Sequence, residues 1–151
     1  KKIYTGRVTN WSELGGFDEE IVIVSRDSSS GTFGVFNDVV NDGKIDGNVI
    51  RLTPTALTQS SNGDVAGTVA ETKGAIGYVG LGYLSSDLKA IMVDGVKPNN
   101  ETVANGQFPI ARPLYMFTDG WPQGETKKFI NFILSSEGQK IAEKIGYVPL
   151  H

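Results

Sequence analysis

The residues best suited to chemistry are one positively charged side chain and a group of hydroxyls four positions further along the chain. Arg26 is followed by Ser30, Gly31 and Thr32, with more serines between them. A guanidinium presents a planar fork of N–H donors that matches an oxyanion in two hydrogen bonds, and hydroxyl groups both donate and accept. These residue types at this spacing predict a site for a small anion. A capped helix beside a surface arginine is the alternative.

The elements around this segment would place its donors at one edge. Residues 21–24 are a β-branched apolar run, which predicts a buried strand that ends near Arg26. Ser30 is the natural N-cap of a following helix, and Gly31 and Thr32 lie in its first turn, where peptide N–H groups lack helical partners and favour an anion. Apolar residues recur at helical spacing after this turn: Phe33, Phe36, Val39 and Val40.

The rest of the chain alternates helix and strand signals, and this order predicts an α/β fold. In the first half of the chain we expect a helical turn at 11–14, a turn at 41–44 and an extended segment at 49–52, followed by a helix that is capped by Ser61 or Asn62 and stops at Lys73-Gly74. We then expect a strand at 75–80, a strand at 90–93 with a hairpin turn at Asp94-Gly95, and an apolar strand at 114–117. Two helices should end the chain, one at 125–134 and one that begins at Ser135 or Ser136 and ends at Gly146.

Composition excludes several classes of function. The 151 residues carry a net charge of −3 and no basic stripe, so a nucleic-acid partner is not expected. There is no cysteine, and the one histidine, His151, stands at the last position, so neither a catalytic constellation nor a metal site is expected. Gly80-Leu81-Gly82 lacks the third glycine of a dinucleotide loop, so we expect no cofactor. No apolar run approaches the ~18 residues of a membrane span.

The segment Arg-x-x-x-Ser-Gly-Thr after an apolar strand closely resembles the phosphate-contacting segment of the phosphate-binding proteins of ABC transporters, members of the class II periplasmic solute-binding protein family. Four further stretches resemble the same family in the family's order: residues 2–11, 74–79, 108–115 and 136–150. The resemblance implies a periplasmic-binding-protein-like (class II) lobe with a mixed central sheet flanked by helices. It also implies that Arg26, Ser30, Gly31 and Thr32 contact phosphate.

The resemblance further implies a domain plan and a role. Residues 1–108 would be the second lobe with the anion-binding turn. Residues 109–151 would be a crossover strand and C-terminal helices that return to a first lobe, whose N-terminal half we expect to be absent here. The implied function is binding of inorganic phosphate as the extracytoplasmic component of a phosphate ABC importer, in the periplasm or on the cell surface, free or lipid-anchored, with permease subunits as partners. A sensory or interaction module that binds phosphate or another oxyanion on the same fold, without transport, is the alternative.

Three questions stay open from the sequence. Some family members carry Arg-x-Asp-Gly-Ser-Gly-Thr, whereas here Asp27 directly follows Arg26, so the acid that restrains the arginine is undetermined. Arg112 is either a salt-bridged hinge residue or a second anion contact. Without a first lobe, the apolar residues after about 109 need another surface, either residues 1–108 or a second copy through segment exchange or homodimerisation.

Overall fold

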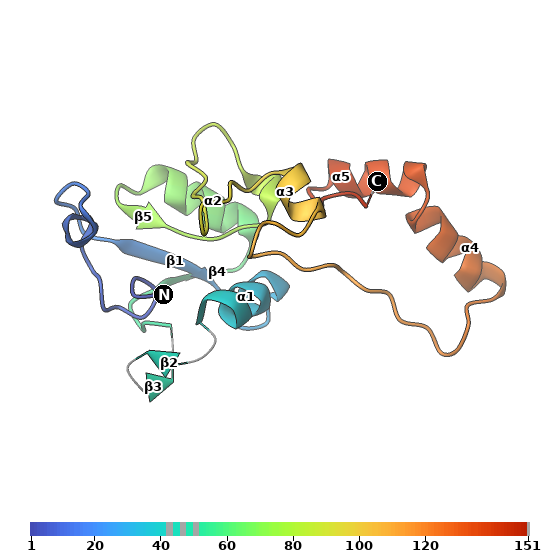
Figure 1. Cartoon of the computed structure of the whole chain (residues 1–151), viewed down its shortest axis with the longest axis horizontal. Coiled ribbons are helices and arrows are strands. Elements are labelled where there is room, and N and C mark those ends of the chain that lie inside the picture. The colour runs from blue at the N-terminus through green and yellow to red at the C-terminus, as the bar shows by residue number, and fades with distance from the viewer. Residues whose placement is uncertain (42–43, 46–47, 50–51, 151) are drawn as a thin grey trace. The chain divides into compact units, whose positions relative to one another are not determined.

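The computed structural model describes residues 1–41, 44–45, 48–49 and 52–150, with side chains described outside 41–51. The chain forms two compact units, Lys1–Ala90 and Ile91–His151, which are described separately below (Figure 1). The predicted division at residue 108 refers to an arrangement with a first lobe and stays a prediction.

The first unit is built on a three-stranded parallel sheet in the order β4-β1-β5. The central strand β1 (Val22–Arg26) pairs with β4 (Leu57–Gln59) on one side and with β5 (Ala75–Ile76) on the other. A separate antiparallel pair joins β2 (Lys44–Ile45) and β3 (Asn48–Val49). The α/β class is therefore confirmed, but the central sheet is parallel in the described residues, not mixed as we predicted, because the antiparallel strands pair only with each other.

Short helices precede, separate and follow these strands, and three of the described helices of this unit begin at a side-chain cap. Ser30 caps α1 (Gly31–Phe36), which continues as a π-helical turn, η2 (Asn37–Asn41). Ser61 caps α2 (Asn62–Glu71). Asn10 caps the short helix η1 (Trp11–Leu14), and η3 (Leu81–Tyr83) follows β5. The predicted starts of α1, α2 and η1 are confirmed because each start is specified by a local side-chain oxygen.

The core of the first unit lies between the sheet and its helices. Its buried apolar members are Tyr4, Val8, Ile21, Ile23, Val24, Phe36 and Val65. Val24 of β1 and Val65 of α2 are fully buried. Gly77, just beyond β5, allows α2 to come close, because a Cβ at this position would lie only 2.8 Å from Val65 Cγ1 and 2.9 Å from Val69 Cγ2.

The second unit contains α3 (Asn100–Ala104), α4 (Gly124–Ile133) and α5 (Ser136–Lys144). Ser135 caps α5, as one of the two predicted alternatives, and α4 contacts α5. Buried Gln139 fixes the tail, because its Nε2 donates to the carbonyl of Ile133 at 2.8 Å and its Oε1 accepts from the amide of Leu150 at 2.8 Å.

Several predicted extended segments are shorter than expected or absent. Residues 114–117 form no strand, and this prediction is wrong: the segment has no described strand beside it, so its peptide groups cannot form a ladder. The predicted strand at 75–80 is limited to β5, and that at 90–93 to a single bridge between Val93 and Val96, around a turn at Asp94-Gly95 where φ is 50° and 79°. The turn predicted at 41–44 and the extended segment predicted at 49–52 lie partly outside the described residues.

The contact between α2 and β5 generates a stability prediction. Gly77→Ala should lower the free energy of unfolding by about 1–3 kcal/mol, because the new methyl group overpacks against Val65 and Val69. Gly67→Ala, in the exposed middle of α2 with no atom within 4 Å of the added Cβ, should instead raise it by about 0.5–1 kcal/mol. Urea unfolding of both variants measures the difference, and equal effects would contradict the close packing at Gly77.

Candidate anion-binding site

The carboxyl ends of the three parallel strands meet at one edge of the sheet. β1 ends at Arg26, β4 ends at Gln59 and leads to Ser60, and β5 leads through Gly77 to Tyr78. Open α/β sheets bind ligands outside the carboxyl ends of their strands, where successive connections run in opposite directions. Here β1 is central and its neighbours come later in the chain on either side, so this edge is the expected location for a site.

The Arg26 side chain is held by the main chain of the neighbouring strand. Its Nε donates to the carbonyl of Gln59 at 3.2 Å, and its Nη2 donates to the carbonyl of Ser60 at 2.9 Å. Only 12% of the side chain is exposed. A guanidinium has five N–H donors, so these two bonds fix its plane and leave three donors for other acceptors.

Asp27 is the acid that pairs with Arg26. Its Oδ2 lies 3.6 Å from Arg26 Nη2. Its Oδ1 accepts hydrogen bonds from the amide of Ser29, at 3.0 Å, and from the Ser29 hydroxyl. The hydrogen bonds from Ser29 hold the pKa of Asp27 below its ordinary value, and the charge of Arg26 lowers it further. Asp27 therefore remains a carboxylate beside the guanidinium, and Ser29 keeps it oriented.

A second carboxylate, Asp64, lies in the first turn of α2. Its Oδ2 accepts from the hydroxyl of Ser60 at 2.8 Å, and its amide donates to the hydroxyl of Ser61 at 3.0 Å. Hydrogen bonding to Ser61 and then to Ser60 lowers the pKa of Asp64, with a smaller contribution from the charge of Arg26. The Ser60 to Asp64 bond connects the start of α2 to the residue whose carbonyl accepts from Arg26.

The other predicted site residues lie at the start of α1. The Ser30 hydroxyl oxygen accepts from the amide of Phe33 at 3.3 Å, and the Ser30 amide donates to the carbonyl of Asp27 at 3.1 Å. Gly31 is exposed and Thr32 is half-buried in the first helical turn. The structure therefore places Arg26 at the end of β1 and the other three residues on the turn that follows. The cap that formed our alternative is present, and its hydroxyl hydrogen can still be donated to an anion.

Tyr78 is a polar partner of Arg26 that sequence reasoning assigned to packing alone. Its hydroxyl oxygen accepts from the Arg26 amide at 3.1 Å and lies 2.7 Å from the Ser25 hydroxyl. Its ring stacks on Phe36, with centroids 3.9 Å apart, and Tyr4 packs beside both rings. Burial raises the pKa of Tyr4, and its hydroxyl has no hydrogen-bond partner in the described part of the chain. The one signal in the sequence was its place in the segment 75–80, which we predicted to be a strand.

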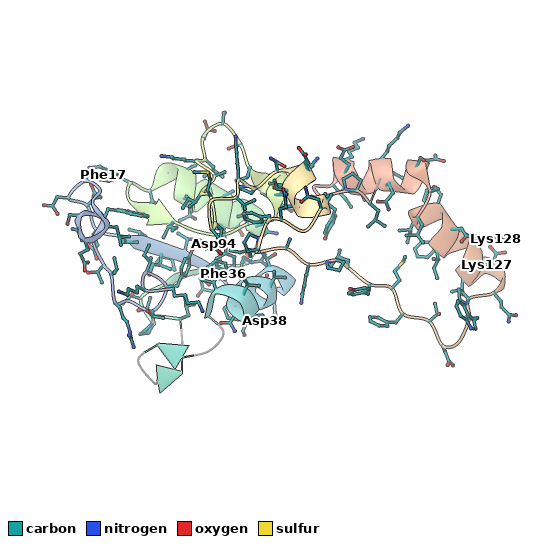
Figure 2. All side chains as sticks on the ribbon, viewed as in Figure 1. Phe17, Phe36, Asp38, Asp94, Lys127 and Lys128 are labelled. Carbon is teal, nitrogen blue, oxygen red and sulfur yellow. The ribbon has the colours of Figure 1, made fainter. Side chains whose placement is uncertain are left out.

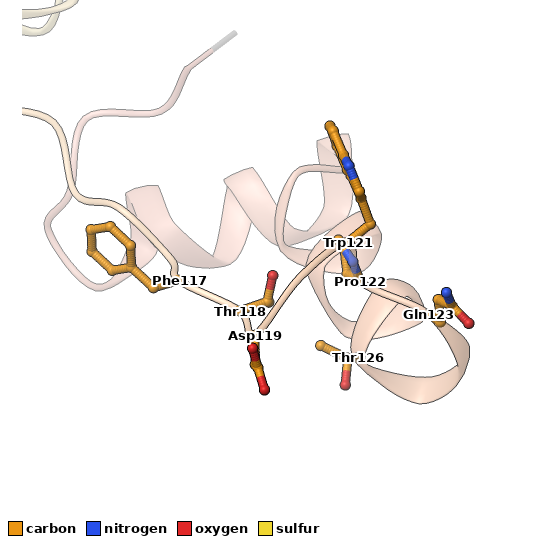
Figure 3. A pocket seen from close by; sticks show the side chains of 7 residues that line it. All are labelled: Phe117, Thr118, Asp119, Trp121, Pro122, Gln123 and Thr126. Atoms are coloured by element: carbon orange, nitrogen blue, oxygen red, sulfur yellow. The ribbon is translucent and has the colours of Figure 1, made fainter.

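Arg112 belongs to the second unit, where its side chain is exposed. A hollow in the same unit is lined by Phe117, Thr118, Asp119, Trp121, Pro122, Gln123 and Thr126 (Figure 3). None of the four predicted site residues lines it. Phe117 and Trp121 project from the segment before α4 and are 90% and 91% exposed, so this hollow is open to solvent and does not enclose a site.

The described residues contain no group of three or more histidine, cysteine, aspartate or glutamate side chains that could hold a metal ion. In the same part of the chain, every helix is too short or too polar to cross a lipid bilayer.

Comparison with known proteins gives consistent matches. The family model described as a PBP superfamily domain matches residues 1–137. The phosphate-binding protein PstS of Bacillus subtilis is 38% identical over 152 residues, which cover 99% of this chain and 48% of that protein. PstS of Borreliella burgdorferi is 31% identical, with 99% of this chain and 56% of that protein covered. The chain thus spans about half the length of these curated relatives.

Solved structures of related proteins show the same fold. A phosphate ABC transporter substrate-binding protein from Clostridium perfringens, with bound phosphate, has a TM-score of 0.81 at 36% identity and is matched over 99% of this chain and 60% of that one. An ABC-type phosphate transport receptor from Vibrio cholerae has a TM-score of 0.79 at 31% identity, over 97% of this chain and 60% of that one. The chain therefore belongs to the PBP superfamily and has its periplasmic-binding-protein-like fold.

Proposed function

We propose that this chain is the phosphate-binding lobe of the extracytoplasmic component of a phosphate ABC importer. The observation that carries the proposal is Arg26, which is fixed by two main-chain carbonyls at the carboxyl edge of the sheet and is followed by the capped start of α1. The identity to PstS proteins, which are named for phosphate binding, supports this assignment of the anion.

The proposed contacts follow from the donors in this segment. The N–H groups of Arg26 not used by Gln59 and Ser60 would form charged hydrogen bonds, each worth roughly 1.5–3 kcal/mol. The Ser30 hydroxyl and the first turn of α1 at Gly31 and Thr32 would add neutral donors. The net charge of −3 does not oppose this, because exposed charges beyond about 8 Å are largely screened at physiological salt. We propose that the chain binds phosphate without transforming it, as a solute-binding protein and not an enzyme.

The second part of the proposal concerns residues 109–151. In the described structure this segment exposes an unusual set of large apolar side chains: Leu114, Tyr115, Met116, Phe117, Trp121, Phe129, Phe132, Leu134, Ile141, Ile145, Tyr147 and Leu150. Large exposed apolar patches on soluble proteins mark sites of interaction. We propose that a first lobe, in the part of the longer relatives that this chain does not match, covers these side chains and closes over the anion with residues 1–108. Association with a second copy would cover the same surface when that lobe is absent.

The transport role would add two further partners and a location. The complete two-lobed protein would work outside the cytoplasm, free or lipid-anchored, and would deliver phosphate to the permease subunits of the importer. The names of the relatives favour this role over a sensory module on the same fold.

The first prediction concerns the principal charge. In the complete two-lobed protein, Arg26→Ala should weaken phosphate binding at least about 100-fold, because two charged hydrogen bonds are lost. Arg7→Ala is the matched control, since it removes the same charge from an exposed position of the first unit, and it should leave binding unchanged. Calorimetric titration with phosphate, and with sulfate in parallel, measures both. Retained affinity in Arg26→Ala would remove its assigned role.

The second prediction concerns the single lobe. Phosphate titrated into the 151-residue chain alone should bind with a Kd weaker than micromolar, because half of the anion's surroundings would be missing. Sub-micromolar binding by this chain would contradict the two-lobe proposal.

The third prediction concerns the apolar surface. The apparent mass of the isolated chain should rise with concentration in light scattering, and Phe117→Ser should weaken this association. Phe17→Ser, at an exposed phenylalanine before β1 in the first unit (Figure 2), should not. A monomeric mass at every concentration would count against self-association.

A further inference from the structure

We propose that Tyr78 is a positioning residue for Arg26, whose hydroxyl holds the end of β1 so that the guanidinium stays in place for the anion. The inference rests on the proposed phosphate binding and deepens it, because it names a residue that acts through Arg26 without touching the ligand.

The Tyr78 hydroxyl provides a hydrogen-bond acceptor where β5 no longer pairs with β1. β5 pairs with β1 only at Val22 and Ile23, opposite Ala75 and Ile76. β1 continues to Arg26 with no described strand on that side, so the Arg26 amide would lack a ladder partner there. The Tyr78 hydroxyl takes this position at 3.1 Å.

Three hydrogen bonds then form a closed cycle at the end of β1. The Arg26 amide donates to Tyr78, the Tyr78 hydroxyl lies 2.7 Å from Ser25 Oγ, and Ser25 Oγ donates to the Arg26 carbonyl at 3.2 Å. If Tyr78 donates to Ser25, one assignment of the hydrogens satisfies all three bonds. Ser25 is fully buried, so water cannot readily replace its partner.

The Tyr78 ring connects β1 to the other element of the proposed site. It stacks on Phe36, the last residue of α1, at 3.9 Å with the ring planes 6° apart. Phe36 is itself buried. Tyr78 therefore contacts both the strand that carries Arg26 and the helix whose first turn carries Ser30, Gly31 and Thr32, so it fixes the position of one relative to the other.

The hydrogen bonds on the β4 side make the position of the guanidinium sensitive to movement of the Arg26 peptide. The guanidinium reaches Gln59 and Ser60 at 3.2 and 2.9 Å, and a shift of the Arg26 peptide would stretch both bonds. Hydrogen bonds weaken steeply with misalignment. Release of the peptide on the Tyr78 side should therefore loosen the side chain on the β4 side.

The structure offers a matched pair of substitutions. Tyr78→Phe removes the hydroxyl and keeps the ring stack. Tyr4→Phe removes a buried hydroxyl from the same aromatic cluster, but one that has no hydrogen-bond partner among the described residues. In the complete two-lobed protein, Tyr78→Phe should weaken phosphate binding about tenfold, whereas Tyr4→Phe should stay within about twofold of the wild type.

A spectroscopic readout separates positioning from loss of stability. In Tyr78→Phe the Arg26 amide should exchange its hydrogen about tenfold faster, while the Trp11 amide, which donates to the Glu19 carbonyl, should be unchanged. Ser25→Ala provides a second variant if Tyr78→Phe does not fold, with an expected loss of about threefold. Urea unfolding of each variant verifies that it is folded under the titration conditions.

The outcomes distinguish this inference from the proposed function. Wild-type affinity in folded Tyr78→Phe, together with lost binding in Arg26→Ala, would overturn the positioning role and leave phosphate binding intact. Equal losses in Tyr78→Phe and Tyr4→Phe would also overturn it, because general packing would then be the cause. No phosphate binding by the wild type would overturn the proposed function itself.

Discussion

The two hydrogen bonds from the Arg26 guanidinium to the carbonyls of Gln59 and Ser60 are the interaction on which the proposed site depends. A charged side chain that is mostly withdrawn from water needs polar partners. Arg26 finds them in main-chain atoms, which the pairing of β1 with β4 places in register. The orientation of the charge is thus a consequence of sheet topology, and it does not require a buried acid.

The use of carbonyl groups as partners of Arg26 also affects how strongly its positive charge can attract an anion. A carbonyl carries only a partial charge, so it orients the guanidinium without neutralising it. The acid beside it, Asp27, is more exposed than Arg26 and already accepts two hydrogen bonds from Ser29. Solvent reaches the Asp27 carboxylate more than the guanidinium, which weakens the pair that they form. Asp27 and exposed Asp64 therefore reduce the attraction of the guanidinium for an anion, but neither covers the donors that Arg26 keeps for it.

Local signals made part of this structure predictable. The strand β1 and the starts of α1 and α2 followed from an apolar run and from Ser30 and Ser61 as caps, since these features act within a few residues. The segment β4, Leu-Thr-Gln, carries no comparable pattern, so the partners of Arg26 could not be found. The prediction of a strand at residues 114–117 was wrong because it rested on local composition alone. The composition suits a strand, but a strand forms only beside another strand. The hydroxyl of Tyr78 was missed because it acts on a residue 52 positions away.

The inventory of donors and acceptors limits what this lobe could recognise alone. Arg26, the Ser30 hydroxyl and the first turn of α1 offer donors, which suit any tetrahedral oxyanion. Protonated phosphate differs from sulfate by a hydrogen that must be accepted. The carboxylates near Arg26 already accept hydrogen bonds within the chain, Asp27 from Ser29 and Asp64 from Ser60. Under the two-lobe proposal, a dedicated acceptor for this hydrogen would come from the first lobe, and affinity and selectivity would then be divided between the two lobes.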